Sequence, residues 1–133
     1  MAIFVDTSAF YAALDADDDN HLAAVDVWRD LGDADETACT SNYVLVETIA
    51  VVGRRLGLQA VRDFNTQFVP LLRVHWVDES LHKRGMAVLL TAGRRDLSLV
   101  DCISFEVIRQ LGLDAAFAFD AHFVQQGFNC IPR

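Results

Sequence analysis

The sequence predicts a single α/β domain in which helices cover a mostly parallel sheet. With 133 residues, 53% of them hydrophobic, the chain can fill one core but is too short for two ordinary domains. Short apolar runs alternate with longer segments of helical periodicity, which is typical of strands joined by helices. No internal repeat and no linker rich in proline or glycine interrupts this alternation, so residues 1–133 are expected to form one domain.

In the first half of the chain, apolar runs at residues 2–5 and about 38–40 are expected to be buried strands. Helical periodicity predicts helices at 7–14, about 21–31, 42–56 and 58–68. Capping residues and helix breakers support these bounds, because polar side chains start helices and glycine or proline ends them. They are Asn20 and Ser41 at two helix starts, and Gly57 and Pro70 at two helix ends.

In the second half, a weaker strand at 73–77 is expected to precede a helix from about Ser80 to Ala92, which Gly93 ends. Ser98 is suited to cap a helix at 99–111. The remaining elements are a strand at 115–119, a short helix and a last strand near 129–131. Alternating strands and helices favour a parallel sheet, because parallel strands need crossover connections.

Two of these strands run directly into an aspartate. Residues 2–5 precede Asp6, and residues 116–119 precede Asp120. The carboxyl ends of the strands in an open parallel sheet form the edge at which ligands bind, so both carboxylates should lie on the functional side. Each aspartate is equally suited to cap the helix that follows, and for either one alone that simpler role stays open.

Glu47 is the only charged residue between positions 42 and 52. Its neighbours at helical spacing are apolar, which places the carboxylate on an apolar stripe rather than on a solvated face. An embedded carboxylate takes a raised pKa or needs a counter-charge. The nearest cations are Arg54 and Arg55, two turns further on, so a structural Glu–Arg pair is the alternative.

Asp101 falls in the first turn of the helix that Ser98 is expected to cap, with apolar residues on both sides. The helix dipole favours an acid at this position. The Ser-x-x-acid spacing also predicts a capping box between Ser98 and Asp101. The two roles are compatible, so Asp101 stays a candidate site residue.

Four acids brought together need compensation. Two unit charges about 4 Å apart cost roughly 4 kcal/mol at an effective dielectric constant near 20. A group of carboxylate oxygens without histidine or thiolate matches a hard cation such as Mg²⁺ or Mn²⁺. The sequence therefore predicts a divalent metal site.

The net charge of −8 opposes nonspecific adhesion to nucleic acid, since such binding normally depends on lysine and arginine. This objection weakens if part of the negative charge is gathered in a pocket that binds cations. No apolar run is long enough to span a bilayer, the N-terminus lacks a signal-peptide pattern, and three cysteines without CxxC spacing suit reduced thiols. We expect a cytoplasmic protein with no membrane partner.

Four motifs resemble those of the PIN-domain family and, within it, the VapC-like toxins of toxin–antitoxin pairs. They are Phe4–Phe10 (FVDTSAF), Tyr43–Thr48 (YVLVET), Leu97–Cys102 (LSLVDC) and Phe117–Phe123 (FAFDAHF). The motifs occur in the family's order, and the resemblance covers essentially the whole chain.

The resemblance implies a mostly parallel central sheet of about four to five strands flanked by helices on both sides. It also implies an acidic pocket for one or two divalent cations, an RNA substrate, a cognate antitoxin and a homodimer. Metal-activated water would then hydrolyse the RNA phosphodiester and leave 3′-hydroxyl and 5′-phosphate ends. The metal ligands, directly or through water, would be Asp6, Glu47, Asp101 and Asp120. The hydroxyl of Ser8, or less often Thr7, would orient water or metal, although Ser8 is equally suited to be an N-cap.

Other polar residues favour simpler interpretations. The run Asp15–Asp19 lacks the glycine and terminal glutamate of an EF-hand and is expected to be a solvated loop. Asp96 is expected in a surface ion pair, with a role as a fifth acid as the alternative. A lone histidine such as His122 is more often structural or exposed, with contact to substrate or metal-bound water as the alternative, since it lies two residues after Asp120.

Basic and aromatic residues near the motifs leave further alternatives open. Arg94 and Arg95 precede the third acid closely enough to contact RNA phosphate, but surface arginines are common. Phe10 and Tyr11 are expected in core or dimer contacts rather than as platforms for bases.

Other classes of protein fit less well. A dehalogenase-type phosphatase needs a second acid where Ser8 stands, a receiver needs a late lysine whereas Lys83 is the only lysine, and neither glycine-rich phosphate motif is present. A PIN-type nuclease of RNA processing or of DNA, and a non-catalytic PIN-fold interaction module, stay open as alternatives.

Overall fold

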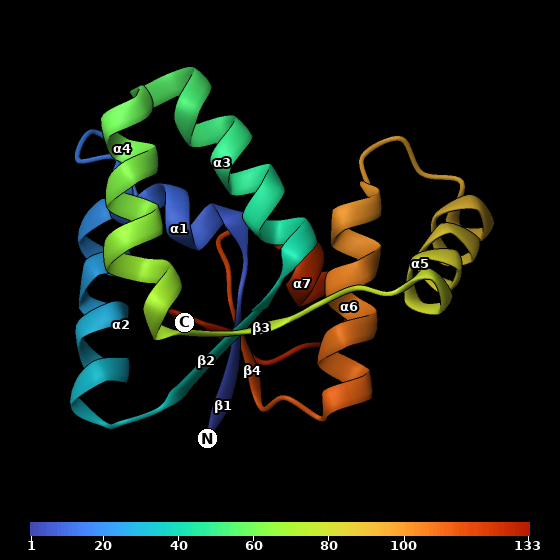
Figure 1. Cartoon of the computed structure of the whole chain (residues 1–133). Helices are drawn as coiled ribbons and strands as arrows, with labels where there is room; N and C mark the ends of the chain where they lie inside the picture. Colours follow the sequence, from blue (N-terminus) through green and yellow to red (C-terminus); the bar gives the residue numbers. More distant parts are fainter.

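The computed structural model describes residues 1–133 and contains one sheet of five strands in the order β3-β2-β1-β4-β5 (Figure 1). All four pairings are parallel, which confirms the predicted α/β class. The strands are β1 (Ala2–Val5), β2 (Thr37–Ser41), β3 (Leu72–His75), β4 (Ala115–Phe117) and β5 (Cys130–Ile131).

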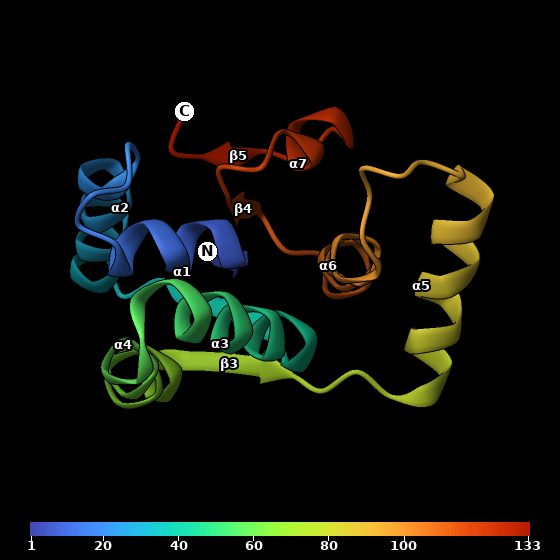
Figure 2. The same ribbon diagram turned by 90° about the horizontal axis from the view of Figure 1, so that it is seen from above.

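Helices lie on both sides of the sheet, as expected. Helices α1, α2 and α4 lie on one side, and α5 and α6 lie on the other (Figures 1 and 2). The helices are α1 (Thr7–Leu14), α2 (His21–Asp33), α3 (Asn42–Leu56), α4 (Leu58–Asp63), α5 (Glu79–Ala92), α6 (Leu99–Leu111) and α7 (Ala121–Gln125). None of them is long and apolar enough to cross a membrane.

Strands β3 and β4 end earlier than predicted, because their partners end. β3 pairs with β2 only as far as Ser41, where α3 begins, and the next available donor, the N–H of Val77, bonds to Oδ1 of Asn42 instead. β4 stops at Phe117, which pairs with the last residues of β1 and β5. Asp120 is therefore separated from its strand by two extended residues rather than following it directly.

Two helix boundaries and one helix cap also differ from the prediction. The expected helix at 58–68 is α4 followed by a π-helical turn at Phe64–Phe68 and a 3₁₀ turn at Val69–Leu71. Helix α5 begins one residue earlier than expected, because the side chain of Asp78 caps it. Asn20 precedes α2, but its side chain makes no capping hydrogen bond. Ser41 and Ser98 do cap α3 and α6 as predicted.

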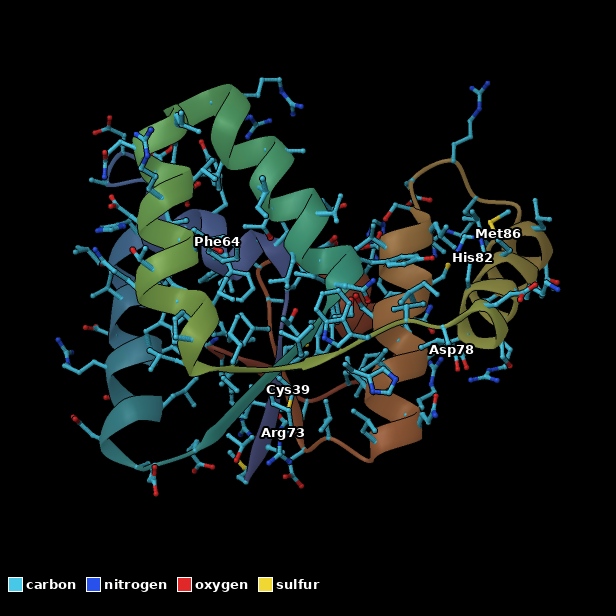
Figure 3. The ribbon with its side chains drawn as sticks, viewed as in Figure 1. Cys39, Phe64, Arg73, Asp78, His82 and Met86 are labelled. Carbon is cyan, nitrogen blue, oxygen red and sulfur yellow. The ribbon has the colours of Figure 1, made fainter.

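An aromatic cluster holds α1, α2 and the end of α4 together. The ring of Phe10 lies 5.7 Å from Trp28, 5.0 Å from Phe64 and 6.3 Å from Phe68, measured between centroids. Phe10 and Phe64 are fully buried, and Figure 3 shows Phe64 directed from the α4 segment into the interior. Each such side chain contributes about 2–3 kcal/mol of burial free energy. Phe10 is thus a core residue, as expected.

The strand order creates a switch point at the carboxyl edge of the sheet. From β1 the chain moves outward to β2 and β3, then returns to the other side of β1 for β4 and β5. The connections after β1 and β4 therefore diverge, which leaves a crevice where ligands bind in sheets of this kind. Asp6 directly follows β1 at this point.

Candidate active site

An open cavity of about 350 Å³ lies at the switch point. All four predicted acids and Ser8 line it, although they come from four separate segments of the chain. The lining residues are Asp6, Thr7, Ser8, Tyr11, Asp18, Asn20, Glu47, Val51, Arg55, Ser98, Asp101, Phe119 and Asp120. Ten of the thirteen have polar or charged side chains that are neither aromatic nor aliphatic, so the cavity suits a charged ligand.

Asp6 is the N-cap of α1 and is 4% exposed. Its Oδ2 accepts hydrogen bonds from the backbone N–H of Ser8 at 3.1 Å and from the Ser8 hydroxyl at 2.7 Å. The Ser8 oxygen in turn accepts from the N–H of Phe119 at 2.9 Å. Ser8 is thus not the N-cap itself but the residue that fixes the Asp6 carboxylate and ties α1 to the segment after β4.

Glu47 projects from α3 and is half-buried, less enclosed than its apolar neighbours suggested. No ion pair joins it to Arg54 or Arg55, so the alternative of a structural Glu–Arg pair is wrong. The neighbouring Thr7 is buried and accepts a hydrogen bond from the hydroxyl of Thr48 at 3.1 Å, which connects α1 with α3 beneath Glu47.

Asp101 is 8% exposed and forms the predicted capping box with Ser98. Its N–H donates to the Ser98 hydroxyl at 3.0 Å, and its Oδ2 accepts from the N–H of Ser98 at 3.2 Å. Asp120 caps α7 through Oδ1, which accepts from the N–H of His122 at 2.9 Å. Capping therefore coexists with a place in the cavity, as the sequence allowed.

In Asp6, Asp101 and Asp120, one carboxylate oxygen is held by a backbone N–H while the other has no partner within the protein. The held oxygen fixes the orientation of the side chain at the start of a helix, where the dipole also favours an anion. The second oxygen is left for a ligand in the cavity. Three aspartates in helix-capping positions thus each present an oriented, unpaired carboxylate oxygen at one edge of the sheet.

The carboxylates oppose one another's ionisation. Burial, with the charges of Asp101 and Glu47 adding to it, raises the pKa of Asp6 to about 7, although the Ser8 hydrogen bonds act in the other direction. Burial also raises the pKa of Glu47 and of Asp101, and the charge of Asp120 contributes to both increases. A divalent cation would remove this repulsion, and an all-oxygen set of carboxylates fits a hard cation.

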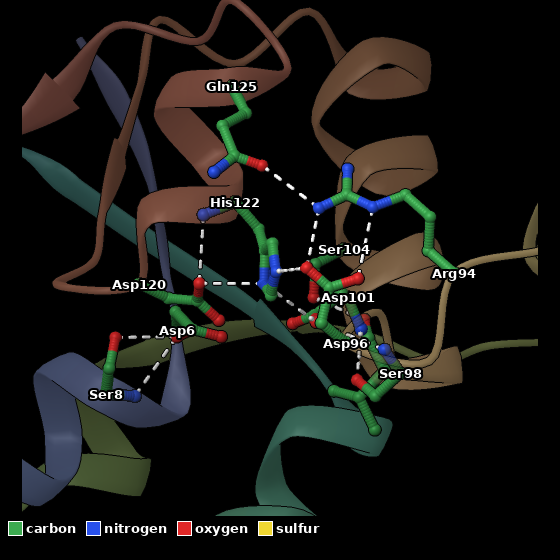
Figure 4. Close-up of polar contacts among 11 residues, drawn as sticks. Asp6, Ser8, Arg94, Asp96, Ser98, Asp101, Ser104, Asp120, His122 and Gln125 are labelled. Carbon is green, nitrogen blue, oxygen red and sulfur yellow. Dashed lines mark hydrogen bonds and ion pairs between the residues drawn. The ribbon is translucent and has the colours of Figure 1, made fainter. Parts of the chain in front are cut away.

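His122 extends the site, which the sequence left open only as the alternative to a structural role (Figure 4). Its Nε2 donates to Oδ2 of Asp96 at 3.1 Å, and its Nδ1 lies 2.9 Å from Oδ1 of Asp120 and 3.5 Å from Oδ2 of Asp101. Asp96 forms the expected ion pair, with Arg94 at 2.6 Å, and this guanidinium lowers the pKa of Asp96 to about 2. Asp96 is therefore not a fifth acid of the cavity.

The opposite wall of the cavity holds residues that the sequence assigned elsewhere. Asp18, expected in a solvated loop, lines the wall together with Asn20. Arg55 is the only basic residue of the wall and lies over the ring of Tyr11, 5.4 Å from its centroid. The loop after α1 folds back toward α3 to bring these residues together, and no local pattern in the sequence signals that return.

A comparison with known families identifies this architecture. The family model described as "PIN domain" matches residues 3–129, nearly the whole chain. The chain belongs to the PIN-domain family.

Similar PIN proteins are known from toxin–antitoxin systems. A Mycobacterium tuberculosis protein described as the 23S rRNA-specific endonuclease VapC20 is 38% identical over 128 residues, 95% of each chain. The crystal structure of VapC20, described as a sarcin–ricin loop cleaving toxin, matches with a TM-score of 0.83 and 35% identity over 95% of each chain. These likenesses confirm the predicted family and its VapC-like group, and with them the class of a toxin-type endoribonuclease.

More distant structures share the PIN fold. VapBC2 from Rickettsia felis, bound to a DNA fragment from its promoter, matches with a TM-score of 0.71 at 13% identity over 98% of this chain and 97% of that one. FitAcB from Neisseria gonorrhoeae matches with a TM-score of 0.66 at 18% identity, over 96% and 95% of the two chains.

Proposed function

We propose that this PIN protein is a Mg²⁺- or Mn²⁺-dependent endoribonuclease, the toxin of a toxin–antitoxin pair. The observation that supports the proposal most is the convergence of four carboxylates on one cavity at the switch point of the sheet. The residues that would hold the cation, directly or through water, are Asp6, Glu47, Asp101 and Asp120. A processing nuclease would share this cavity, and the likeness to VapC20 favours the toxin over it. The four acids in the cavity disfavour a non-catalytic PIN module.

When bound, a divalent cation at this site would neutralise the carboxylates and supply activated water for in-line attack on phosphorus. The chain's own part is to hold the acceptors in place. Ser8 fixes Asp6 through two hydrogen bonds to one carboxylate oxygen, and the backbone N–H of Ser98 fixes Asp101 through one. Such prior ordering lowers the reorganisation needed during the reaction.

RNA must reach an acidic cavity on a chain of net charge −8. Arg55 is placed to contact a phosphate next to the one that is cleaved, because it is the basic residue of the cavity wall. Tyr11 lies beneath its guanidinium and limits its motion. Given the likeness to VapC20, the first substrate to examine is 23S rRNA, including its sarcin–ricin loop.

Partners and location belong to the same proposal. A cognate antitoxin that blocks the cavity, a homodimer and a cytoplasmic location all agree with the likeness to toxins of toxin–antitoxin pairs. Coexpression with the product of a neighbouring short reading frame would supply the antitoxin for a binding measurement.

Cleavage of ribosomal RNA tests the proposal directly. The protein should cut RNA with Mg²⁺ or Mn²⁺ and not with EDTA, leaving 3′-hydroxyl and 5′-phosphate ends. Asp6→Asn and Asp101→Asn should each lower the rate at least about a hundredfold, since each removes a charge that holds the cation. Primer extension and end-labelling measure both the site and the ends.

A matched control is Asp26→Asn, which removes an exposed carboxylate paired with Arg29 on α2, far from the cavity lining. Its cleavage rate should equal that of the unmodified protein. Undiminished cleavage in Asp6→Asn or Asp101→Asn, or 2′,3′-cyclic phosphate ends, would refute the assigned chemistry.

A further inference from the structure

His122 links the acidic cavity to an ion pair outside it. The guanidinium of Arg94 contacts both oxygens of Asp96, at 3.1 and 2.6 Å, so this carboxylate is held in one orientation (Figure 4). Its Oδ2 also receives the hydrogen bond from Nε2 of His122. Arg94 and Asp96 together therefore set the orientation of the His122 ring.

This hydrogen bond requires a proton on Nε2 of His122. A carboxylate only accepts hydrogen bonds, so Nε2 of His122 must be the N–H nitrogen. The neutral ring then has its lone pair on Nδ1, the nitrogen that lies against Asp101 and Asp120. A lone pair facing two carboxylates is repelled by them, so the contact needs a positive charge among the three groups, which either a second ring proton or a metal cation supplies.

The surroundings of Nδ1 agree with a ligand role. The His122 side chain is 17% exposed, and Nδ1 itself is inaccessible to solvent and makes no well-directed hydrogen bond. Donor atoms of Asp101, Asp120 and His122 all lie within 4.8 Å of one another, close enough to share one ion. Both partners of His122 in this group are already candidate ligands.

We propose that Nδ1 of His122 is a ligand of the cation held by Asp101 and Asp120, and that Asp96 is a positioning residue for this ligand. The inference rests on the proposed metal-dependent function and adds a nitrogen to what the sequence predicts as an all-oxygen site. A carboxylate that receives the second N–H of a metal-bound histidine is the usual arrangement in metalloproteins.

A nitrogen ligand changes which cation the site prefers. Mg²⁺ strongly favours oxygen ligands, whereas imidazole binds transition metals better. The site should therefore bind Mn²⁺ more tightly than Mg²⁺, and His122 should contribute to that difference.

Pulsed electron paramagnetic resonance of Mn²⁺ bound to the protein, without RNA, tests the proposal. Electron spin-echo envelope modulation detects nitrogen bound directly to Mn²⁺, and labelling the four histidines with ¹⁵N identifies the nitrogen as imidazole. The unmodified protein should show this coupling. Competition titration with Mg²⁺ gives the relative affinities in the same samples.

Two substitutions of His122 separate the ring's two contacts. His122→Gln can keep a polar contact to Asp96 but has no atom at the Nδ1 position, so the nitrogen coupling should disappear. The Mn²⁺ affinity should fall about tenfold, and the Mg²⁺ affinity should change less. His122→Asn places an amide oxygen near the Nδ1 position, so it should lose the coupling but retain more of the affinity. Circular dichroism of the metal-free variants establishes that both are folded.

Asp96→Ala tests the positioning role. Removal of a carboxylate that orients a ligand typically weakens metal binding about 10- to 100-fold, so Mn²⁺ affinity and the amplitude of nitrogen coupling should both fall. The matched control is His75→Gln at the end of β3, outside the cavity lining, which should leave the coupling intact.

The outcomes separate this inference from the proposed function. Mn²⁺ bound without histidine coupling, or with coupling that persists in His122→Gln, overturns the ligand role while leaving the nuclease proposal intact. Coupling that is lost in His122→Gln, in a protein that does not cut RNA, overturns the nuclease and keeps the ligand. A protein that binds no Mn²⁺ at all overturns both.

Discussion

Asp6 serves both the fold and the site, and these roles make opposite demands on its charge. As the N-cap of α1 it needs a side-chain acceptor, which a neutral amide could also provide. As a cavity acid it must be ionised to hold a cation, although burial raises its pKa to about 7. Ionisation of Asp6 therefore destabilises the folded, metal-free protein. The function requires this charge, so the loss of stability is tolerated.

The pH dependence of stability should show this cost. An unfolded Asp6 ionises near pH 4, whereas the folded residue retains its proton until about pH 7. The folded state thus binds more protons over this interval, and stability must fall as pH rises through it. Asp6→Asn removes this contribution, so in EDTA the variant should gain stability over the unmodified protein between pH 4 and 8, by up to about 4 kcal/mol.

Denaturant unfolding at several pH values measures the difference. Asp78→Asn is the matched control, because Asp78 caps α5 in the same way but is exposed and far from the cavity lining. Its stability relative to the unmodified protein should vary little with pH. A constant difference between Asp6→Asn and the unmodified protein across this range would contradict the buried-charge account.

At the scale of elements, a glycine allows α5 to pack closely against α6. A Cβ built on Gly85 would lie 2.4 Å from Cδ1 and 2.9 Å from Cγ1 of Ile103, which is fully buried. The approach matters for the site, because α6 also carries Asp101. Figure 2 shows α5 on the outer side of α6, and His82 also connects α5 to Tyr43 of α3.

Gly85→Ala should destabilise the protein despite the better helix propensity of alanine. Overpacking of a filled contact costs about 1–3 kcal/mol, whereas the propensity gain is about 1 kcal/mol, so a net loss of up to about 2 kcal/mol is expected. Gly32→Ala in α2 is the control, since nothing lies within 4 Å of its added Cβ, and it should be neutral or stabilising. Equal stability of the two variants in thermal unfolding would rule out the close approach.

For the whole molecule, the distribution of charge and of apolar surface matters more than the totals. Part of the net charge of −8 is concentrated in the cavity, where ionisation is suppressed until a cation binds. Several large apolar side chains are exposed on α2 and α3, among them Leu22 at 78% and Val46 at 68%. Such surface favours association with a further chain.

The proposed homodimer predicts a sedimentation mass twice that of one chain. Burial of the exposed apolar side chains would drive this association, so the dimer should persist in high salt, where surface ion pairs are screened. Sedimentation velocity at low and high salt measures it. A mass of one chain at every protein concentration would exclude the homodimer. The exposed apolar side chains would then be available for contact with the antitoxin.

The sequence by itself determined those features that depend on interactions between residues close together in the chain. Apolar runs, caps and glycines act over a few residues, so the strands, most helices and the capping box of Ser98 and Asp101 could be predicted. The four acids could be proposed because each stands in a recognisable local setting, at a strand end or in a helix turn. The shortened ends of β3 and β4 could not, because a strand ends where its partner does.

Tertiary structure alone decided which residues meet in the cavity. His122 contacts an aspartate 26 residues away in sequence, and Arg55 comes from the far end of α3 to lie over Tyr11. Such contacts depend on the angles at which helices pack on the sheet, which no local pattern encodes. The sequence therefore determined the acids and the elements that carry them, whereas packing decided the pKa of Asp6, the surroundings of His122 and the basic wall of the cavity.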